Sequence, residues 1–322
     1  MNGLTLYPPV ATQRDQWVLD RRPARNKVDP HRPYAFLTEQ ERSHTGEVVS
    51  VATILLTNRE CPWRCVMCDL WKNTLIEPTP HGAIPEQIEY ALTRLPPARQ
   101  VKLYNSGSFF DRGAIPPSDY PYVAALVEQH DRVIVESHPS LVSNLTFEFR
   151  DLVNGQLEVA MGLETVHPEA LEKINKKLTI SLFATAASRL RKASVDLRVF
   201  VLVQPPFVRP DEALFWAQRS LDFAFECGAT AVTLIPTRAG NGAMEELAAH
   251  GDFTPPQLST VEASMTYGIG LQSGRVFVDL WDSARLQCCP QCRDNRLERI
   301  HLINLSQRLT SPVSCLRCGG SS

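Results

Sequence analysis

Short apolar runs alternate with stretches of helical spacing along most of this chain, beginning at Val48. Runs rich in β-branched residues predict six strands, at residues 48–56, 101–105, 132–136, 157–164, 197–203 and 231–236. Amphipathic spacing predicts helices over residues 85–95, 118–130, 145–153, 167–174, 182–193 and 211–226. Near-continuous apolar strands that alternate with helices are typical of a parallel sheet covered on both faces. The pattern therefore predicts an α/β fold, a partial (β/α) barrel of about six parallel strands.

The residues on either side of this region differ from it in composition. Residues 1–46 are rich in proline and arginine and lack periodicity, which predicts an extended N-terminal arm. This arm either packs on the core through its aromatic side chains or takes part in substrate binding. Residues 47–282 would form the barrel core, and residues 283–322, with five cysteines, a small Cys-rich metal-binding module at the C-terminus.

The net charge and the apolar runs of the chain limit the classes to which this protein can belong. The 33 Lys and Arg residues nearly balance the 35 Asp and Glu residues, so the net charge is −2 and no overall positive field attracts nucleic acid or anionic lipid. The longest apolar runs, such as residues 48–56, are far shorter than the roughly 20 residues of a membrane-spanning helix. The N-terminal residues lack the basic lead and apolar stretch of a secretory signal. We therefore expect a cytoplasmic protein without a membrane partner, and its oligomeric state stays open.

Eight of the nine cysteines fall into two tight groups, which in a reducing cytoplasm indicates ligation of a metal or cluster rather than disulfides. The first group, Cys61, Cys65 and Cys68, has the spacing C-x3-C-x2-C directly after the first predicted strand. Three thiolates on one loop can hold three irons of a 4Fe-4S cluster and leave the fourth iron without a protein ligand. Zinc is the alternative, but zinc sites favour C-x2-C pairs and four ligands.

The second group supplies four thiolates in two C-x2-C pairs, Cys289 with Cys292 and Cys315 with Cys318. This is the ligand set of a structural zinc site, and a second, auxiliary 4Fe-4S cluster would use the same four residues. We expect zinc, with the auxiliary cluster as the alternative. Cys288 is left out because adjacent cysteines rarely both bind one metal.

Several blocks of sequence resemble the radical S-adenosylmethionine (SAM) superfamily, over about residues 48–240. The similar blocks are RECPWRCVMCDLW, VKLYNSGSFFDRGAIP, VIVESHP, LEVAMGLET, FVLVQPPF and VTLIPT. They are most similar to the branch that holds the radical partner of archaeosine biosynthesis and the elongator catalytic core. This resemblance implies a 4Fe-4S cluster on the first cysteine group, SAM at its open iron, and a 5′-deoxyadenosyl radical. It also implies an electron donor such as flavodoxin or ferredoxin.

The same resemblance suggests a modified tRNA base as substrate. A small molecule or a peptide is the alternative substrate within radical SAM chemistry. The alternative of another class is a non-catalytic zinc-ribbon binding protein in which the barrel serves only as a scaffold.

The resemblance also implies where SAM would bind. The loops at the carboxyl ends of parallel strands surround one opening of the barrel, which we call the mouth. Ser106, Gly107 and Ser108 replace the usual Gly-Gly-Glu loop, which leaves the ammonium group of SAM to backbone carbonyls and hydroxyls. Glu136 and Glu164 would face that ammonium group or the ribose hydroxyls. Their alternative role is to cap helices or to pair in solvent.

Two further residues stand on the fifth predicted strand and the loop after it. Gln204 would close the opposite side of the mouth, although the QPP sequence is also typical of a rigid turn without a ligand. Arg198 would pair with the methionine carboxylate of SAM, and its alternative position is an exposed strand end.

Overall fold

The computed structural model describes residues 7–318, and it contains an eight-stranded sheet in which the strands follow one another in chain order. The first strand pairs antiparallel with the second, and all later neighbours pair in parallel. The strands are β1 Ala35–Arg42, β2 Val48–Leu55, β3 Gln100–Tyr104, β4 Arg132–Glu136, β5 Gln156–Glu164, β6 Asp196–Val203, β7 Ala231–Pro236 and β8 Arg275–Val278. The six predicted strands are confirmed as β2 to β7. The prediction of about six parallel strands missed β8, which makes seven parallel strands, and the antiparallel β1, which makes the sheet mixed.

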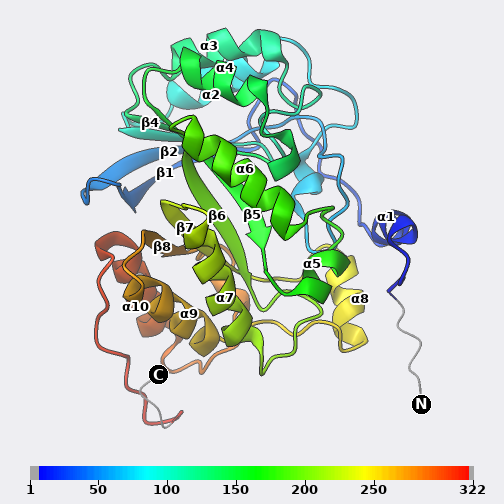
Figure 1. Cartoon of the computed structure of the whole chain (residues 1–322), viewed down its shortest axis with the longest axis vertical. Helices are drawn as coiled ribbons and strands as arrows, with labels where there is room; N and C mark the ends of the chain where they lie inside the picture. The colour runs from blue at the N-terminus through cyan, green and yellow to red at the C-terminus, as the bar shows by residue number, and fades with distance from the viewer. Residues whose placement is uncertain (1–6, 319–322) are drawn as a thin grey trace.

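Helices connect the parallel strands, as the spacing of apolar residues predicts. The α-helices are α1 Ala11–Asp20, α2 Ala83–Leu92, α3 Tyr120–Leu126, α4 Asn144–Leu152, α5 Pro168–Lys173, α6 Ile180–Lys192, α7 Ala213–Glu226, α8 Ala243–Ala249, α9 Leu258–Gly270 and α10 Arg293–Ser306. Short 3-10 turns lie at η1 Leu70–Asn73, η2 Pro117–Asp119, η3 Pro139–Leu141 and η4 Ser283–Arg285. Figure 1 shows α6 and α7 in front of β5 and β6, with α2, α3 and α4 gathered at the top of the view, above β4.

The two faces of the sheet differ in chemistry. Alternate strand residues such as Val101, Leu103, Val199 and Val201 are fully buried and belong to the core beneath the helices. The other residues of the same strands face the concave side of the curled sheet, and many of them are charged. The expectation of a sheet covered by helices on both faces is therefore wrong, since buried ion pairs fill one end of the concave face.

Five charged residues on the concave face join strands that are far apart in the sheet. Glu41 on β1 lies 2.5 Å from Arg198 on β6 and 2.6 Å from Lys102 on β3, measured between charged atoms. Glu158 on β5 lies 2.6 Å from Arg198 and 3.2 Å from Arg275 on β8. Contacts from β1 to β6 require the sheet to curl into a partial barrel. Arg198 is 2% exposed, so it does not lie at an exposed strand end. Its guanidinium group pairs with Glu41 and Glu158, and these protein carboxylates take the place that we expected for the carboxylate of SAM.

These ion pairs stabilise the charged forms of buried carboxyls. Burial alone would raise the pKa of Glu158, but the guanidinium groups of Arg198, Arg275 and Arg132 outweigh it and lower this pKa to about 2. Burial also opposes ionisation of Glu41, and Arg198 and Lys102 again hold its pKa well below the usual range. The network therefore closes the amino-terminal end of the barrel with charges that remain paired at neutral pH.

The predicted extended arm contains a helix and a strand. Helix α1 buries Trp17, whose ring makes an edge-to-face contact with Tyr7 at 4.9 Å between centroids. The apolar pattern does not predict strand β1, because its residues on the concave face of the sheet include Glu39 and Glu41, which pair with Lys102. Tyr7 and Trp17 of this arm pack on the core, and the substrate-binding role weighed for residues 1–46 stays a prediction. Residues 1–6 lie outside the described part of the chain.

The C-terminal segment is joined to the barrel by α10, which packs against β1 and β8 (Figure 1). Side-chain amides of α10 and its cap hydrogen-bond the free edge of β8. Val278 donates its N–H to Asn304 Oδ1 at 2.9 Å, and Val276 donates to Gln307 Oε1 at 2.7 Å. A sheet edge needs such partners because its backbone groups are otherwise unpaired. Residues 319–322 of the predicted module lie outside the described part.

Among the described helices, none combines the length and the apolar character needed to cross a membrane.

Candidate functional site

The first cysteine group lies in the loop that leaves the carboxyl end of β2. All three cysteines are partly buried and none is in a disulfide. Burial is the main cause that raises the pKa of Cys61 to about 12 and that of Cys68 to about 11. Cys68 adds to the rise at Cys61, and Asp69 adds to the rise at Cys68. Burial also raises the pKa of Cys65, which Cys68 and Cys61 raise further. Thiols that oppose one another's ionisation in a buried loop are suited to a shared cation, because metal binding releases their protons.

Side chains from distant segments hold this loop in place. Asn241 Nδ2 donates to the backbone carbonyls of Val66 at 2.7 Å and Cys68 at 3.0 Å. The indole N–H of Trp71 also donates to the Cys68 carbonyl, at 3.1 Å. Val66 in turn donates its N–H to the carbonyl of Ile174 at 3.0 Å. The positions of the cysteines are therefore fixed by the loop after β7 and by the end of α5.

A buried histidine supports the loop from the side of β4. The rings of His138 and Trp63 stack with centroids 3.8 Å apart. The N–H of Ser140 donates to His138 Nδ1 at 3.2 Å, so Nε2 carries the proton and donates to the Lys176 carbonyl at 3.1 Å. Burial and the nearby Lys176 lower the pKa of His138 to about 3. His138 is therefore neutral at physiological pH and acts on the cysteine loop by packing.

The loop after β3 contains the predicted Ser106, Gly107 and Ser108 and is organised by the predicted Glu136. Glu136 Oε1 accepts the N–H groups of Asn105 at 2.6 Å and Gly107 at 3.3 Å. Burial is the main cause that raises the pKa of this carboxyl, and the backbone donors oppose it. One oxygen of Glu136 thus holds the loop itself, a role that its position at the end of a strand did not indicate.

Three contacts bring the loop after β3 against the rest of the mouth. A Cβ atom on Gly107 would lie 3.3 Å from Cys61 Cβ, so a residue without a side chain permits the close approach. Ser108 Oγ accepts the N–H of His138 at 2.6 Å. Ser106 Oγ lies 3.2 Å from the hydroxyl of Tyr34. The structure therefore brings Ser106, Gly107 and Ser108 beside the first cysteine group.

Glu164, the predicted carboxylate at the end of β5, forms an ion pair with Lys176. The ammonium group of Lys176 opposes the rise in pKa that burial causes at both Cys61 and Cys65. Gly162 makes this arrangement possible, because a Cβ atom there would lie 2.1 Å from both Glu164 Oε1 and Lys176 Nζ. The pair therefore places one buried cation beside two of the cysteines.

Gln204 has a different environment from the other predicted residues. It adopts a positive φ of 58°, is 3% exposed, and donates its Nε2–H to the Val208 carbonyl at 2.8 Å. These contacts are those of the rigid turn that the QPP sequence also predicts.

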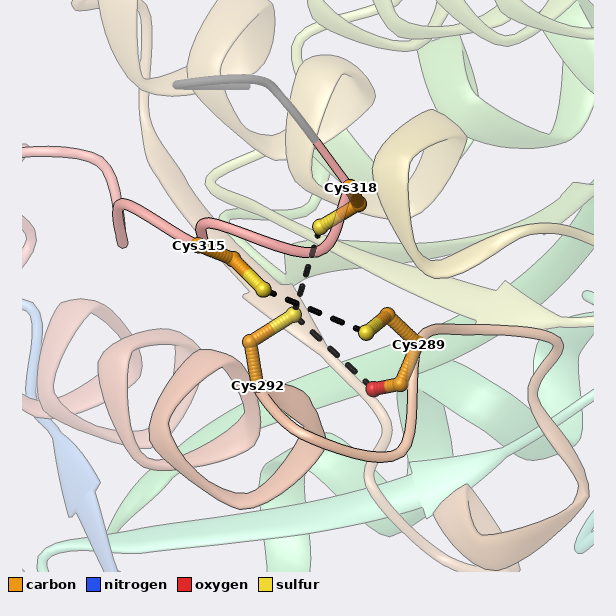
Figure 2. Close-up of side chains that lie close together, drawn as sticks. All are labelled: Cys289, Cys292, Cys315 and Cys318. Carbon is orange, nitrogen blue, oxygen red and sulfur yellow. Dashed lines mark hydrogen bonds between the residues drawn. The ribbon is translucent and has the colours of Figure 1, made fainter.

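The second cysteine group brings four sulfur atoms together, as Figure 2 shows. The Sγ atoms of Cys289 and Cys315 are 3.9 Å apart, those of Cys292 and Cys318 are 3.8 Å apart, and all four lie within 4.8 Å of one another. Backbone and side-chain hydrogen bonds from Cys318 and Arg317 lower the pKa of Cys315 to about 6. Four convergent sulfurs form a candidate metal site.

Sequence reasoning assigned no role in the site to Tyr34, His138, Lys176 or Asn241. His138 and Asn241 stand in loops that follow strands, so their position was a usable signal. Lys176 follows α5 and Tyr34 precedes β1, and only the tertiary structure brings them to the mouth.

The chain matches no protein-family model. It is 23% identical over 253 residues to an uncharacterised protein of Methanocaldococcus jannaschii, covering 74% of this chain and 69% of that protein. It is 27% identical over 229 residues to archaeosine synthase subunit beta of Methanosarcina acetivorans, covering 67% of this chain and 66% of that protein. The chain therefore spans about two thirds of the length of these relatives.

Solved structures that are similar to the chain share little sequence with it. Elp3 of the archaeon Methanocaldococcus infernus has a TM-score of 0.47 and 12% identity, covering 73% of this chain and 60% of that chain. Coproporphyrinogen III oxidase (HemN) of Escherichia coli, a radical SAM enzyme, has a TM-score of 0.46 and 12% identity, covering 81% of this chain and 56% of that chain.

A second archaeosine synthase subunit beta, from Thermococcus kodakarensis, is 29% identical over 127 residues, which are 38% of this chain and 39% of that protein. Two separate subunits of this kind thus share sequence with the chain. This protein is a distant homologue of archaeosine synthase subunit beta.

Proposed function

We propose that this protein is a radical SAM enzyme that holds a 4Fe-4S cluster on Cys61, Cys65 and Cys68. The observation that carries the proposal is the partly buried cysteine loop at the carboxyl end of β2. Gly107 packs against Cys61 of this loop, and His138 stacks on its Trp63. The distant homology to archaeosine synthase subunit beta supports the same assignment.

The chemistry of these residues supports the assignment of this cluster. Three thiols in C-x3-C-x2-C spacing offer ligands for three irons, and Lys176 offers a positive charge that offsets part of their negative charge. A bound cluster of this type would supply the electron that cleaves SAM into methionine and a 5′-deoxyadenosyl radical, which abstracts hydrogen from the substrate.

The protein's own residues position the reactants and exclude water. Trp71 and Asn241 hold the Cys68 carbonyl, and Glu136 holds the backbone N–H groups of residues 105 and 107. That loop leaves the hydroxyls of Ser106 and Ser108 and its own carbonyls as acceptors for the ammonium group of SAM. Glu164, which Lys176 neutralises, is the second carboxylate at the mouth.

We infer that the substrate is a base in tRNA, because the relatives of assigned function are archaeosine synthase subunits. The reduction of the cluster takes one electron, and we assign this step to a small electron carrier such as flavodoxin or ferredoxin.

For the C-terminal cysteines we propose a single structural zinc ion. Four sulfurs at about 2.3 Å from one zinc form a tetrahedron whose edges are about 3.8 Å long. The separations of 3.8 Å and 3.9 Å in this site fit that tetrahedron. In an auxiliary 4Fe-4S cluster each cysteine would bind a different iron, so the sulfurs would stand farther apart around the cluster.

The proposed function is tested by incubating the anaerobically purified protein with dithionite and SAM, with and without total tRNA. We expect 5′-deoxyadenosine to form slowly alone and faster with tRNA. The Cys65→Ala variant should form none, and Cys227→Ala, which changes a partly buried cysteine outside both groups, should match the wild type. Formation of S-adenosylhomocysteine alone would indicate methyl transfer and contradict the proposal. Stimulation by a small molecule or a peptide but not by tRNA would contradict the substrate assignment.

A further inference from the structure

A cavity of about 280 Å³ opens beside the mouth, between the loops that follow β7 and β8. Its volume is close to the lower end of the range of small-molecule sites, which is roughly 300 to 1,000 Å³. Six of the residues that line it are Arg238, Pro255, Pro256, Trp281, Arg285 and Leu286.

The apolar part of the lining includes an exposed aromatic ring. Trp281 is 57% exposed, although large apolar side chains are costly to leave in water. Pro255, Pro256 and the buried Leu286 complete the apolar surface. An exposed indole beside proline rings is suited to stacking a planar, partly apolar ligand.

Two arginines supply hydrogen-bond donors to the same cavity. Arg238 lies 3.6 Å from Asp69 and 3.6 Å from Asp282, which are ion-pair distances too long for hydrogen bonds. Arg285 donates one N–H group to the Ala239 carbonyl at 2.7 Å. Within residues 7–318, no other hydrogen bond of these two guanidinium groups is present, so most of their N–H donors remain for a ligand.

The cavity is connected to the first cysteine group. Asp69, the partner of Arg238, follows Cys68 directly in the chain. Asn241 holds the Cys68 carbonyl, and Lys72 donates to the carbonyl of Gly240, which also lines the cavity. A ligand in this cavity would therefore lie beside the loop to which the proposed function assigns the chemistry.

We propose that this cavity binds a nucleobase of an unpaired, unstacked nucleotide in an RNA substrate, an inference that rests on the proposed function. Trp281 would stack on the base, and Arg238 and Arg285 would donate to its edge acceptors. Single-stranded RNA is recognised in this way, by aromatic and guanidinium planes and by contacts to base edges. The lining carries Glu245 and Asp282 as well as two arginines, so its balanced charge favours a base over a cluster of phosphates.

The inference is tested by fluorescence anisotropy with a labelled, short single-stranded oligoribonucleotide, with the same sequence as a duplex for comparison. Trp281→Ala should weaken binding of the single strand by roughly 5- to 100-fold, from the loss of one stacked base. Trp281→Phe, which keeps a flat ring, should restore most of the affinity. Phe215→Ala removes a comparably exposed ring on α7, 54% exposed, and should bind like the wild type.

Three outcomes would overturn the inference. These outcomes are equal affinity of the wild type and Trp281→Ala, equal binding of the duplex, and no RNA binding by the wild type. Unfolding of Trp281→Ala is monitored by its thermal midpoint, and the Trp281→Phe variant remains informative if Trp281→Ala does not fold. Binding is measured without SAM or reductant, so failure of this inference differs from failure of the proposed function, which shows as absent 5′-deoxyadenosine.

Discussion

Gly162→Ala is a severe test of the geometry around the Lys176–Glu164 ion pair. The added Cβ atom would lie 2.1 Å from Glu164 Oε1 and from Lys176 Nζ, whereas ordinary contacts begin near 3.4 Å. Both charged groups must therefore retreat by more than 1 Å. Their side chains are only 9% and 12% exposed, so little open solvent is available to receive them.

The expected cost follows from overpacking in a closed space. Inserting one methyl group into a packed interior costs typically about 1–3 kcal/mol. In domains of 150–250 residues each kcal/mol lowers the unfolding midpoint by about 2–4 °C. We expect Gly162→Ala to unfold several degrees below the wild type, and we expect its iron content after reconstitution to fall because Lys176 moves away from Cys61 and Cys65.

The matched control is Gly270→Ala, at the end of α9. A Cβ atom at Gly270 would have no heavy atom within 4 Å, so the same chemical change meets open space. Alanine is about 1 kcal/mol more favourable than glycine in a helix, and this variant should be at least as stable as the wild type. Differential scanning calorimetry compares the three proteins. Equal midpoints for Gly162→Ala and Gly270→Ala would refute the reasoning.

Two further predictions concern the ion pairs and the C-terminal cysteines. Because the pKa of Glu158 is about 2 when folded and 4.5 in its unperturbed state, its carboxylate contributes stability above pH 4.5 that is lost as pH falls toward 2. Glu158→Gln should therefore lose about 3–5 kcal/mol at pH 7 and lie closer to the wild type near pH 3, measured by urea unfolding. Cys315→Ser should lose zinc while keeping iron, measured by mass spectrometry of both metals, whereas Cys288→Ser should keep both. An unchanged zinc content in Cys315→Ser would remove that residue from the ligand set.

The sequence predicted the central strands because their apolar residues face the helices. It did not predict β1, whose concave positions carry Glu39 and Glu41 for pairing with Lys102. The four residues of β8 form too short a run to be recognised, and their edge is completed by side chains of α10. Strands that depend on distant partners are thus the ones that local periodicity misses.

The site shows the same division between local and tertiary information. Cysteine spacing predicted which four tail residues converge, because two C-x2-C pairs can form one knuckle each. It could not predict that Glu136 hydrogen-bonds the loop after β3, since that contact joins residues about 30 positions apart. Arg198 was misjudged because a strand-end arginine is buried only when acidic partners from other strands surround it.

The central claim is that Cys61, Cys65 and Cys68 hold the iron–sulfur cluster and the tail cysteines hold a different metal. Its most direct test is the iron, sulfide and zinc content of the anaerobically reconstituted wild type and of the Cys61→Ala, Cys65→Ala, Cys68→Ala triple variant. We expect about four irons and one zinc per chain in the wild type, and almost no iron with about one zinc in the triple variant. About four irons surviving in the triple variant, with a reducible cluster spectrum, would contradict the account.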